Sequence, residues 1–198
     1  ECLRRYEADP ERYFLPDQYN NPANPLAHYE TTGPEIYRQT GGLITHFVAG
    51  IGTSGTLMGA GAFLREQNPG VGLYAAEPET ALHGIEGLKH MPTAIVPGLW
   101  QPALVDEVIP VPTDAAYDMT RRLAREEGIF CGHSSGAGMY AVSKLVERLD
   151  EGMIVAILPD GGERYLSRSI WAYSEPVEWE KPDDSHRPRP AGTDYRTR

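Results

Sequence analysis

One stretch constrains the fold more than any other, the segment 44–59, which reads Ile-Thr-His-Phe-Val-Ala-Gly-Ile-Gly-Thr-Ser-Gly-Thr-Leu-Met-Gly. The apolar run Phe47–Ala49 predicts a buried strand, a glycine-rich turn follows over 50–56, and a helical pattern begins at Leu57. Glycines let backbone N–H groups approach an anion, and the first turn of a helix offers unpaired N–H groups. Hydroxyl donors are added by Thr53, Ser54 and Thr56. The stretch therefore predicts a phosphate-binding turn, against the plainer alternative of an ordinary strand-to-helix turn.

Strands alternate with helices along the remainder of the chain. Further strands are expected at 73–76, 105–111, 129–131 and 153–158, and helices at 57–67, 113–128, 139–149 and 167–173. This alternation predicts an α/β fold of three layers, with a mainly parallel sheet and helices on both faces. Ligands of such sheets bind at the carboxyl ends of strands. The glycine-rich turns after Ala49, Cys131 and Leu158 are therefore expected to line one site.

The N-terminal part reads differently. A helix end is expected at 1–8 and a short strand at 13–19, and the run Asn-Asn-Pro-Ala-Asn-Pro at 20–25 predicts a turn. Thr32 is expected to cap a helix that Gly41 and Gly42 end. The turn is the expected domain crossing. It divides the end of a smaller domain (1–21) from a large domain (22–174), which a charged, proline-rich and disordered tail (175–198) follows.

Composition narrows the function classes. The net charge of −10 repels nucleic acid and favours small-molecule partners. Cys2 and Cys131 are the only cysteines, so the sequence has neither a disulfide framework nor a zinc pattern, and a reducing compartment such as the cytoplasm is expected. No apolar run approaches the roughly 20 residues of a membrane span, and no secretory leader is visible, so no membrane association is expected.

A dinucleotide-binding motif is one alternative interpretation of the glycine turn. Gly50-Ile-Gly-Thr-Ser-Gly55 fits G-x-G-x-x-G between a strand and a helix, and Glu77 ends the next strand, where a ribose-binding acid belongs. An NAD-dependent oxidoreductase is therefore a competing hypothesis. The hydroxyls within the turn argue against it, because they suit a single phosphate dianion better than a pyrophosphate held mainly by backbone.

A serine nucleophile is a second alternative. Gly132-His-Ser-Ser-Gly136 fits G-x-S-x-G between a strand and a helix, and Asp160 and His186 follow in the chain order of an α/β-hydrolase. His186, however, lies in a polar stretch that is poorly suited to hold a rigid base. The plainer interpretation of Ser134 is a helix N-cap.

Several stretches together point to one family. They are 21–25 (Asn-Pro-Ala-Asn-Pro), 31–35 (Thr-Thr-Gly-Pro-Glu), 45–48 (Thr-His-Phe-Val), 52–56 (Gly-Thr-Ser-Gly-Thr), 127–137 (Glu-Gly-Ile-Phe-Cys-Gly-His-Ser-Ser-Gly-Ala) and 162–167 (Gly-Glu-Arg-Tyr-Leu-Ser). In this order and spacing they resemble the cysteine synthase family, pyridoxal-phosphate enzymes of the tryptophan synthase β-subunit-like fold and relatives of cystathionine β-synthase. The resemblance covers roughly residues 1–173. The glycine loop and Asp106-Glu-Val look most like the cysteine synthase B branch.

The resemblance implies a cofactor site. Gly52, Thr53, Ser54, Gly55 and Thr56 match the loop that holds the phosphate of pyridoxal 5′-phosphate, and Ser134 matches the serine that hydrogen-bonds its pyridine nitrogen. A hydroxyl is not acidic enough to keep that nitrogen protonated, which suits β-elimination over carbanion chemistry. The implied reaction is β-replacement on O-acetylserine or O-phosphoserine, with sulfide or another sulfur donor, giving L-cysteine.

Two further residues are implied to meet the substrate. Gln18 matches a family glutamine near the substrate carboxylate, although it equally reads as a polar residue at a strand end. Lys89 is the basic residue available in the long segment 78–101, where relatives that use O-phosphoserine place a cation. The plainer interpretation of Lys89 is a solvated loop lysine.

The resemblance has one departure. The family's Schiff-base lysine and substrate loop precede the region that this sequence matches, and Lys89, Lys144 and Lys181 do not sit in a matching motif. We therefore expect no catalytic residue of that kind in this chain, which would be inactive alone and would need its missing N-terminal segment. Homodimerisation is expected from the family. A non-catalytic binding or assembly module that kept the fold is the remaining alternative.

Overall fold

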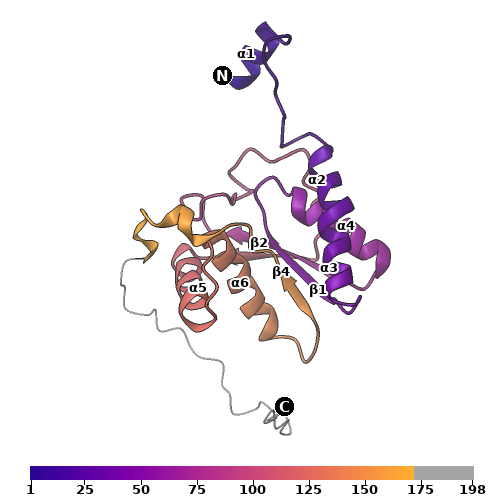
Figure 1. Ribbon diagram of the computed structural model, residues 1–198, viewed down its shortest axis with the longest axis vertical. Coiled ribbons are helices and arrows are strands. Elements are labelled where there is room, and N and C mark those ends of the chain that lie inside the picture. Colours follow the sequence, from indigo (N-terminus) through magenta and orange to yellow (C-terminus); the bar gives the residue numbers. More distant parts are fainter. Residues whose placement is uncertain (172–198) are drawn as a thin grey trace, which may run out of the picture.

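The computed structural model describes residues 1–171, and in it the central strands form one parallel sheet (Figure 1). The strands are β1 (His46–Gly50), β2 (Gly72–Pro78), β3 (Glu107–Val111) and β4 (Ile154–Ala156), in the order β3-β2-β1-β4. Each pairing among them is parallel, with Phe47 opposite Leu73 on one side and Val155 on the other. The predicted mainly parallel sheet is therefore confirmed.

Helices cover both faces of the sheet. In Figure 1, α3 (Gly33–Gln39) and α4 (Gly55–Gln67) lie on one side of the strands, and α5 (Thr113–Glu126) and α6 (His133–Val146) lie on the other. Two layers of helices enclose the sheet, as the alternation of the sequence predicts.

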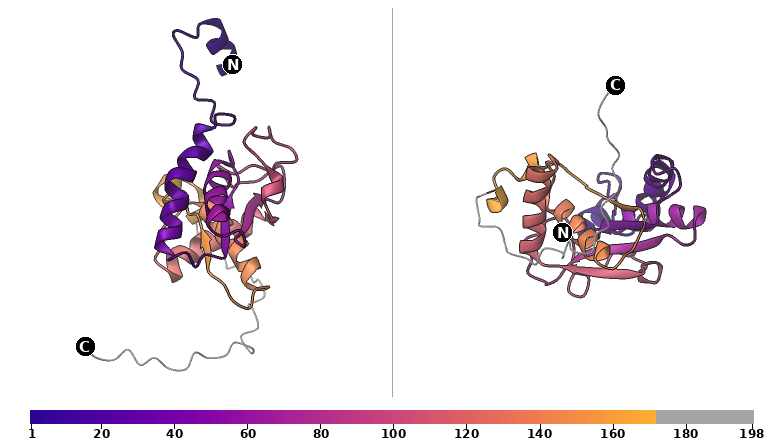
Figure 2. Two further views of the ribbon diagram at one scale, coloured as in Figure 1. Left: turned by 90° about the vertical axis from the view of Figure 1, so that its right-hand side faces the viewer. Right: turned by 90° about the horizontal axis from the view of Figure 1, so that it is seen from below.

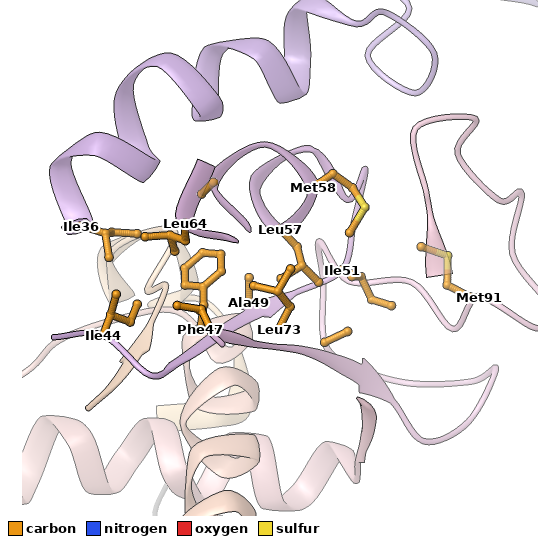
Figure 3. Close-up of a cluster of buried hydrophobic side chains, with 13 residues drawn as sticks. Ile36, Ile44, Phe47, Ala49, Ile51, Leu57, Met58, Leu64, Leu73 and Met91 are labelled. Atoms are coloured by element: carbon orange, nitrogen blue, oxygen red, sulfur yellow. The ribbon is translucent and has the colours of Figure 1, made fainter. Parts of the chain in front are cut away.

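Alternate residues of β1 supply the two cores. Phe47 and Ala49 pack with Leu57 and Leu64 of α4 (Figure 3), whereas Val48 packs with a second cluster that contains Ala137. Successive side chains of a strand point to opposite faces, which explains the division. Burying a leucine such as Leu57 stabilises the fold by about 1.5–3 kcal/mol. This packing fixes β1, and with it the turn that leaves its carboxyl end.

The N-terminal region departs from two sequence predictions. α1 (Cys2–Ala8) is present as expected, has no buried residue and stands away from the body in Figures 1 and 2. The expected strand at 13–19 is absent from the described residues, because this stretch pairs with no strand and Asp17 takes a left-handed turn at φ +43°. The expected turn at 20–25 is present at its start, and a short helix replaces it from Ala23 onward.

That short helix, α2 (Ala23–Ala27), runs through a π-helical turn, η1 (His28–Thr32), into α3. Pro25 is tolerated because the first N–H groups of a helix have no partner within it. Thr32 is helical and makes no side-chain cap, so the expected cap is wrong. The expected stop holds, with Gly41 and Gly42 at positive φ.

The C-terminal half also contains differences. The expected strand at 129–131 reduces to one antiparallel bridge between Cys131 and Gly161, and α6 begins directly at His133. Short 3-10 turns occur before β3, as η2 (Pro102–Leu104), and after β4, as η3 (Gly162–Tyr165) and η4 (Ser169–Trp171). The last of these lies within the expected helix at 167–173. The expected disordered tail and His186 lie outside the described residues. Within residues 1–171, no helix is long and apolar enough to cross a membrane.

Candidate cofactor site

The glycine turn joins β1 to α4 with a shape that side chains would obstruct. Ser54 takes the left-handed conformation at φ +70°, and α4 begins at the next residue, Gly55. An added Cβ at Gly55 would lie 1.8 Å from Asn24 Oδ1, and one at Gly52 would lie 2.5 Å from the carbonyl oxygen of Gly87. Glycine is required at both positions because neighbouring chain segments approach the turn so closely.

Two side chains from the N-terminal helices brace the hydroxyls of this turn. Asn24 Nδ2 donates to Thr53 Oγ1 over 3.1 Å and to the carbonyl oxygen of Gln18 over 2.7 Å. His28 Nε2 lies 3.2 Å from Thr56 Oγ1, and burial lowers the pKa of His28. Thr53 Oγ1 also accepts from the Gly55 N–H over 3.3 Å. Because its oxygen accepts twice, the Thr53 O–H is left to donate toward the space in front of the turn.

A cavity of about 240 Å³ opens between the turn after β1, the start of α6 and the segment after β4. The expected turn after Cys131 is wrong, because helix α6 takes its place. Ser134, the second residue of α6, lines this cavity opposite the glycine turn and is 7% exposed. The lining residues are Gly50, Gly52, Thr53, Ser54, Gly55, Thr56, Glu86, Gly87, Leu88, Ser134, Pro159, Asp160 and Tyr165. The structure therefore brings Ser134 and the five predicted loop residues together in one cavity.

A carboxylate and a phenol lie in the same cavity. Tyr165 O–H donates to Asp160 Oδ2 over 2.6 Å. Burial, followed by this hydrogen bond, raises the pKa of Tyr165 to about 12, so the phenol stays protonated near neutral pH. Asp160 Oδ1 is buried and has no hydrogen-bond partner among the described residues. No lysine, arginine or histidine in the described chain lines the cavity, so it combines hydroxyl and N–H donors with acidic acceptors.

The two residues expected to meet the substrate lie outside this cavity lining. Gln18 is exposed, and its carbonyl oxygen accepts from Asn24. Lys89 Nζ lies 4.5 Å from the centroid of the Tyr19 ring, a cation–π contact. Their substrate roles stay predictions.

The residues that suggested a dinucleotide site or a serine nucleophile make other contacts in the structure. Glu77 is buried, accepts from the Met91 N–H over 3.1 Å and does not line the cavity. Its carboxylate therefore lies away from the space where a ribose would follow the glycine turn. His133, beside Ser134, accepts from the Glu86 N–H, and His186 lies outside the described residues. In residues 1–171 no hydrogen bond joins Ser134 to a histidine.

Sequence reasoning missed four residues of this region. Asn24 and His28 brace the glycine turn, and Glu86 and Tyr165 line the cavity. Asn24 belongs to a run that predicts only a turn, and His28 carried no spacing signal. The family-like stretch at 162–167 includes Tyr165 but does not specify its contact with Asp160.

Comparison with known proteins agrees with this geometry. Residues 1–160 match the family described as pyridoxal-phosphate dependent enzyme. A cysteine synthase from Aquifex aeolicus is 46% identical over 176 residues, which cover 87% of this chain and 53% of the relative. Cysteine synthase B from Escherichia coli is 45% identical over 157 residues, covering 79% of this chain and 52% of the relative. The chain therefore spans about half the length of the curated relatives it matches.

Solved structures show the same fold. O-acetyl serine sulfhydrylase isoform 3 from Entamoeba histolytica matches with a TM-score of 0.82 at 35% identity, over 89% of this chain and 55% of that one. The O-acetylserine dependent cystathionine beta-synthase from Helicobacter pylori matches with a TM-score of 0.78 at 34% identity, over 85% and 58%. The resemblance to cysteine synthases is confirmed, and the chain belongs to the family of pyridoxal-phosphate dependent enzymes.

Proposed function

We propose that the full-length protein catalyses β-replacement on an activated serine, O-acetylserine or O-phosphoserine, with sulfide or another sulfur donor to give L-cysteine. The observation that carries this proposal is the cavity that the glycine turn and Ser134 line together. The names of the similar cysteine synthases and of the O-acetyl serine sulfhydrylase support the substrate class. In this proposal, residues 52–56 form the part of the site that holds the cofactor phosphate, the phosphate cup. Ser134 is the partner of the cofactor's ring nitrogen.

The residues present fit pyridoxal phosphate. The glycines at 52 and 55 let Gly87 and Asn24 approach the turn closely, and the turn and α4 provide N–H and hydroxyl donors for a phosphate dianion. Ser134 lines the cavity, where its hydroxyl is placed to meet a ring nitrogen. When bound, this cofactor acts as an electron sink for bonds at the substrate amino acid.

Each group in the cavity has a proposed task. The Thr53 O–H and the N–H groups at the start of α4 hold the phosphate and orient the cofactor. The Ser134 hydroxyl holds the ring without giving it a full proton, because a hydroxyl is far less acidic than a carboxyl group. Gln18 and Lys89 are proposed to meet the substrate carboxylate and leaving group, for which Lys89 must leave the Tyr19 ring.

The lysine that carries the cofactor is proposed to come from a segment outside this chain. Lys89 contacts Tyr19, Lys144 Nζ pairs with Glu147 over 2.9 Å, and Lys181 lies outside the described residues. We also propose that residues 1–21 end a smaller domain and that residues 22–174 form part of a large one. A homodimer in the cytoplasm completes the proposed whole protein.

A second candidate function is a binding or assembly module without catalysis. The observation that favours it is that neither described lysine lines the cavity. Product analysis separates the two candidates. Full-length protein incubated with pyridoxal phosphate, O-acetylserine and sulfide is expected to form L-cysteine, and the Ser134→Ala variant is expected to form less.

Ser143→Ala is the matched control, because Ser143 is also on α6 but its hydroxyl donates to the Tyr140 carbonyl away from the cavity. Absence of cysteine formation from O-acetylserine and from O-phosphoserine, in protein that binds the cofactor, would favour the module.

A further inference from the structure

One wall of the cavity is the segment Glu86–Leu88, which belongs to the long irregular connection between β2 and β3. Its neighbours are tied to two parts of the fold. Gly84 N–H donates to Thr113 Oγ1 over 3.2 Å, and Tyr117 O–H donates to the Gly84 carbonyl over 2.8 Å. On the other side, the Lys89 N–H donates to the Ile51 carbonyl over 2.9 Å. The wall therefore lies between the start of α5 and the glycine turn.

The wall itself is held by a histidine. The Glu86 N–H donates to His133 Nε2 over 2.7 Å, and it is shared with the Gly84 carbonyl at 3.1 Å. His133 is the first residue of α6, is 2% exposed, and directly precedes Ser134. Its ring packs edge-on against Tyr165, with centroids 4.3 Å apart, and against Tyr117, with centroids 5.5 Å apart. The imidazole of His133 thus connects the start of α6 to the Glu86–Leu88 wall.

This contact requires an uncharged imidazole. Nε2 accepts a proton from the Glu86 amide, so the ring proton of the neutral form lies on Nδ1. His133 Nδ1 is buried and has no hydrogen-bond partner among the described residues. Protonation of the ring would turn Nε2 into a donor facing another donor, and would leave a charge on a buried group. The hydrogen bond to the wall would then break.

The surroundings of His133 contain charges of both signs. Burial is the main effect and lowers the pKa of His133 below its usual 6.5. The carboxylates of Glu86 and Asp160 oppose this change, and Arg168, which pairs with Glu86, adds to it. The other titratable groups packed on the ring are Tyr117 and Tyr165, both with raised pKa values. His133 is therefore neutral near pH 7.

A shift of the wall would reach the phosphate cup directly. An added Cβ at Gly50 would lie 2.6 Å from Leu88 Cδ2, and the Gly87 carbonyl stands over Gly52. A displacement of Gly87 or Leu88 would therefore also displace the glycine turn, because closely packed groups have few alternative arrangements.

We propose that His133 is a positioning residue, whose neutral imidazole fixes the Glu86–Leu88 wall and makes the shape of the cofactor cavity depend on pH. The inference rests on the proposed function only where it concerns the cofactor, because the contact with the wall exists without it.

Two variants of the full-length protein separate the hydrogen bond from packing. His133→Gln places an amide oxygen where Nε2 stands, so it keeps the acceptor and cannot titrate. His133→Phe keeps an aromatic ring between Tyr117 and Tyr165 but removes the acceptor. The first measurement is hydrogen exchange of the peptide that contains Glu86–Leu88, expressed as a protection factor at each pH. The second is the Kd for pyridoxal phosphate, measured by equilibrium titration.

At about pH 8, His133→Phe is expected to lower the protection factor by about three- to tenfold, because the Glu86 N–H loses its shorter bond and keeps only the 3.1 Å bond to the Gly84 carbonyl, whereas His133→Gln stays within about twofold of the unsubstituted protein. As the pH falls below 6.5, protection of the wall is expected to decline in the unsubstituted protein and not in His133→Gln. Cofactor affinity is expected to follow the same order.

Equal protection in His133→Phe and the unsubstituted protein would overturn the proposal. A loss in His133→Gln as large as in His133→Phe would also overturn it, since the acceptor would then be irrelevant. If the unsubstituted protein binds no pyridoxal phosphate, the proposed function fails, and the exchange data still decide the role of His133.

Discussion

Asn24 Nδ2 donates a hydrogen bond to Thr53 Oγ1 over 3.1 Å, and thereby joins α2 to the turn that opens α4. The same nitrogen donates to the Gln18 carbonyl over 2.7 Å, so it also fixes the chain that leads into α2. Twenty-nine positions separate Asn24 from Thr53. The glycine turn is thus braced by a residue from outside the strand–turn–helix unit.

The first prediction concerns this bracing bond. Asn24→Ala in the full-length protein is expected to weaken pyridoxal phosphate binding by about three- to tenfold, because Thr53 loses the donor that orients its hydroxyl. Equilibrium titration measures the Kd. Asn68→Ala is the control, since Asn68 Oδ1 accepts from the Gly70 N–H at the other end of α4. An unchanged Kd in Asn24→Ala would show that the bond does not shape the cup.

The second prediction compares two glycines of α6. An added Cβ at Gly136 would lie 2.2 Å from the Ala116 carbonyl oxygen of α5, whereas one at Gly138 would lie 3.5 Å from the nearest atom, the Ile157 carbonyl oxygen. Gly136→Ala is therefore expected to lower the free energy of unfolding by about 1–3 kcal/mol through overpacking. Gly138→Ala is expected to raise the free energy of unfolding by about 0.4–1 kcal/mol, because alanine has fewer backbone conformations than glycine in the unfolded chain.

Chemical denaturation of the full-length variants measures both free energies. Equal effects of Gly136→Ala and Gly138→Ala would contradict the close contact between α5 and α6 on which the position of Ser134 depends.

The third prediction concerns Glu77 and pH. Burial raises the pKa of Glu77 above 4.5, and the hydrogen bond from the Met91 N–H and the nearby His90 partly oppose this. A carboxyl group whose pKa is higher in the folded protein than in the unfolded one lowers the free energy of unfolding as the pH rises from 4.5 through the folded pKa. Glu77→Gln keeps an acceptor for Met91 and removes the charge.

The Glu77→Gln variant is therefore expected to be more stable than the unsubstituted protein at pH 7 and to lose this advantage below about pH 4. Denaturation midpoints at both pH values provide the measurement, with the exposed neighbour Glu79→Gln as the control. A destabilised Glu77→Gln at pH 7 would mean that the ionised carboxylate contributes more than its burial costs.

The fourth prediction concerns the choice of substrate. Lys89 contacts Tyr19 and is proposed to leave it for the leaving group of the substrate. Lys89→Ala in the full-length protein is expected to lower kcat/KM for O-phosphoserine more than for O-acetylserine, because only the first carries a phosphate dianion. Lys144→Ala, which removes a lysine paired with Glu147 on α6, is the control. An unchanged ratio between the two substrates would remove Lys89 from the site.

Local signals were sufficient for much of the fold. The buried apolar run of β1, the glycine turn and the helix that follows are encoded within one continuous stretch, and the structure has all three. The segments after β1 and β4 meet in one cavity because the carboxyl ends of neighbouring parallel strands share one edge. These features depend on backbone conformation, and local residue types favour it directly: valine favours a strand, and glycine favours a tight turn.

Features that depend on partners could not be inferred. The stretch 13–19 has strand-forming residues but no strand beside it, and 129–131 makes only one bridge because Gly161 is its sole partner there in the described chain. Pro25 was expected to break a helix, yet it occupies a first turn where its missing N–H costs nothing. The contacts of Asn24 with Thr53 and of His133 with Glu86 join distant segments, so no local pattern contains them.

The most direct test of the central claim is a visible absorption spectrum of this chain with pyridoxal phosphate, recorded alone and after adding the family's N-terminal segment. The account predicts that the absorption band of the bound cofactor appears only with that segment, and that Ser134→Ala alters this band while Ser143→Ala leaves it unchanged. A band of the same strength from the chain alone would contradict the claim that the cofactor-bearing lysine lies elsewhere. The absence of any band in the combined sample would contradict the claim that this cavity holds the cofactor.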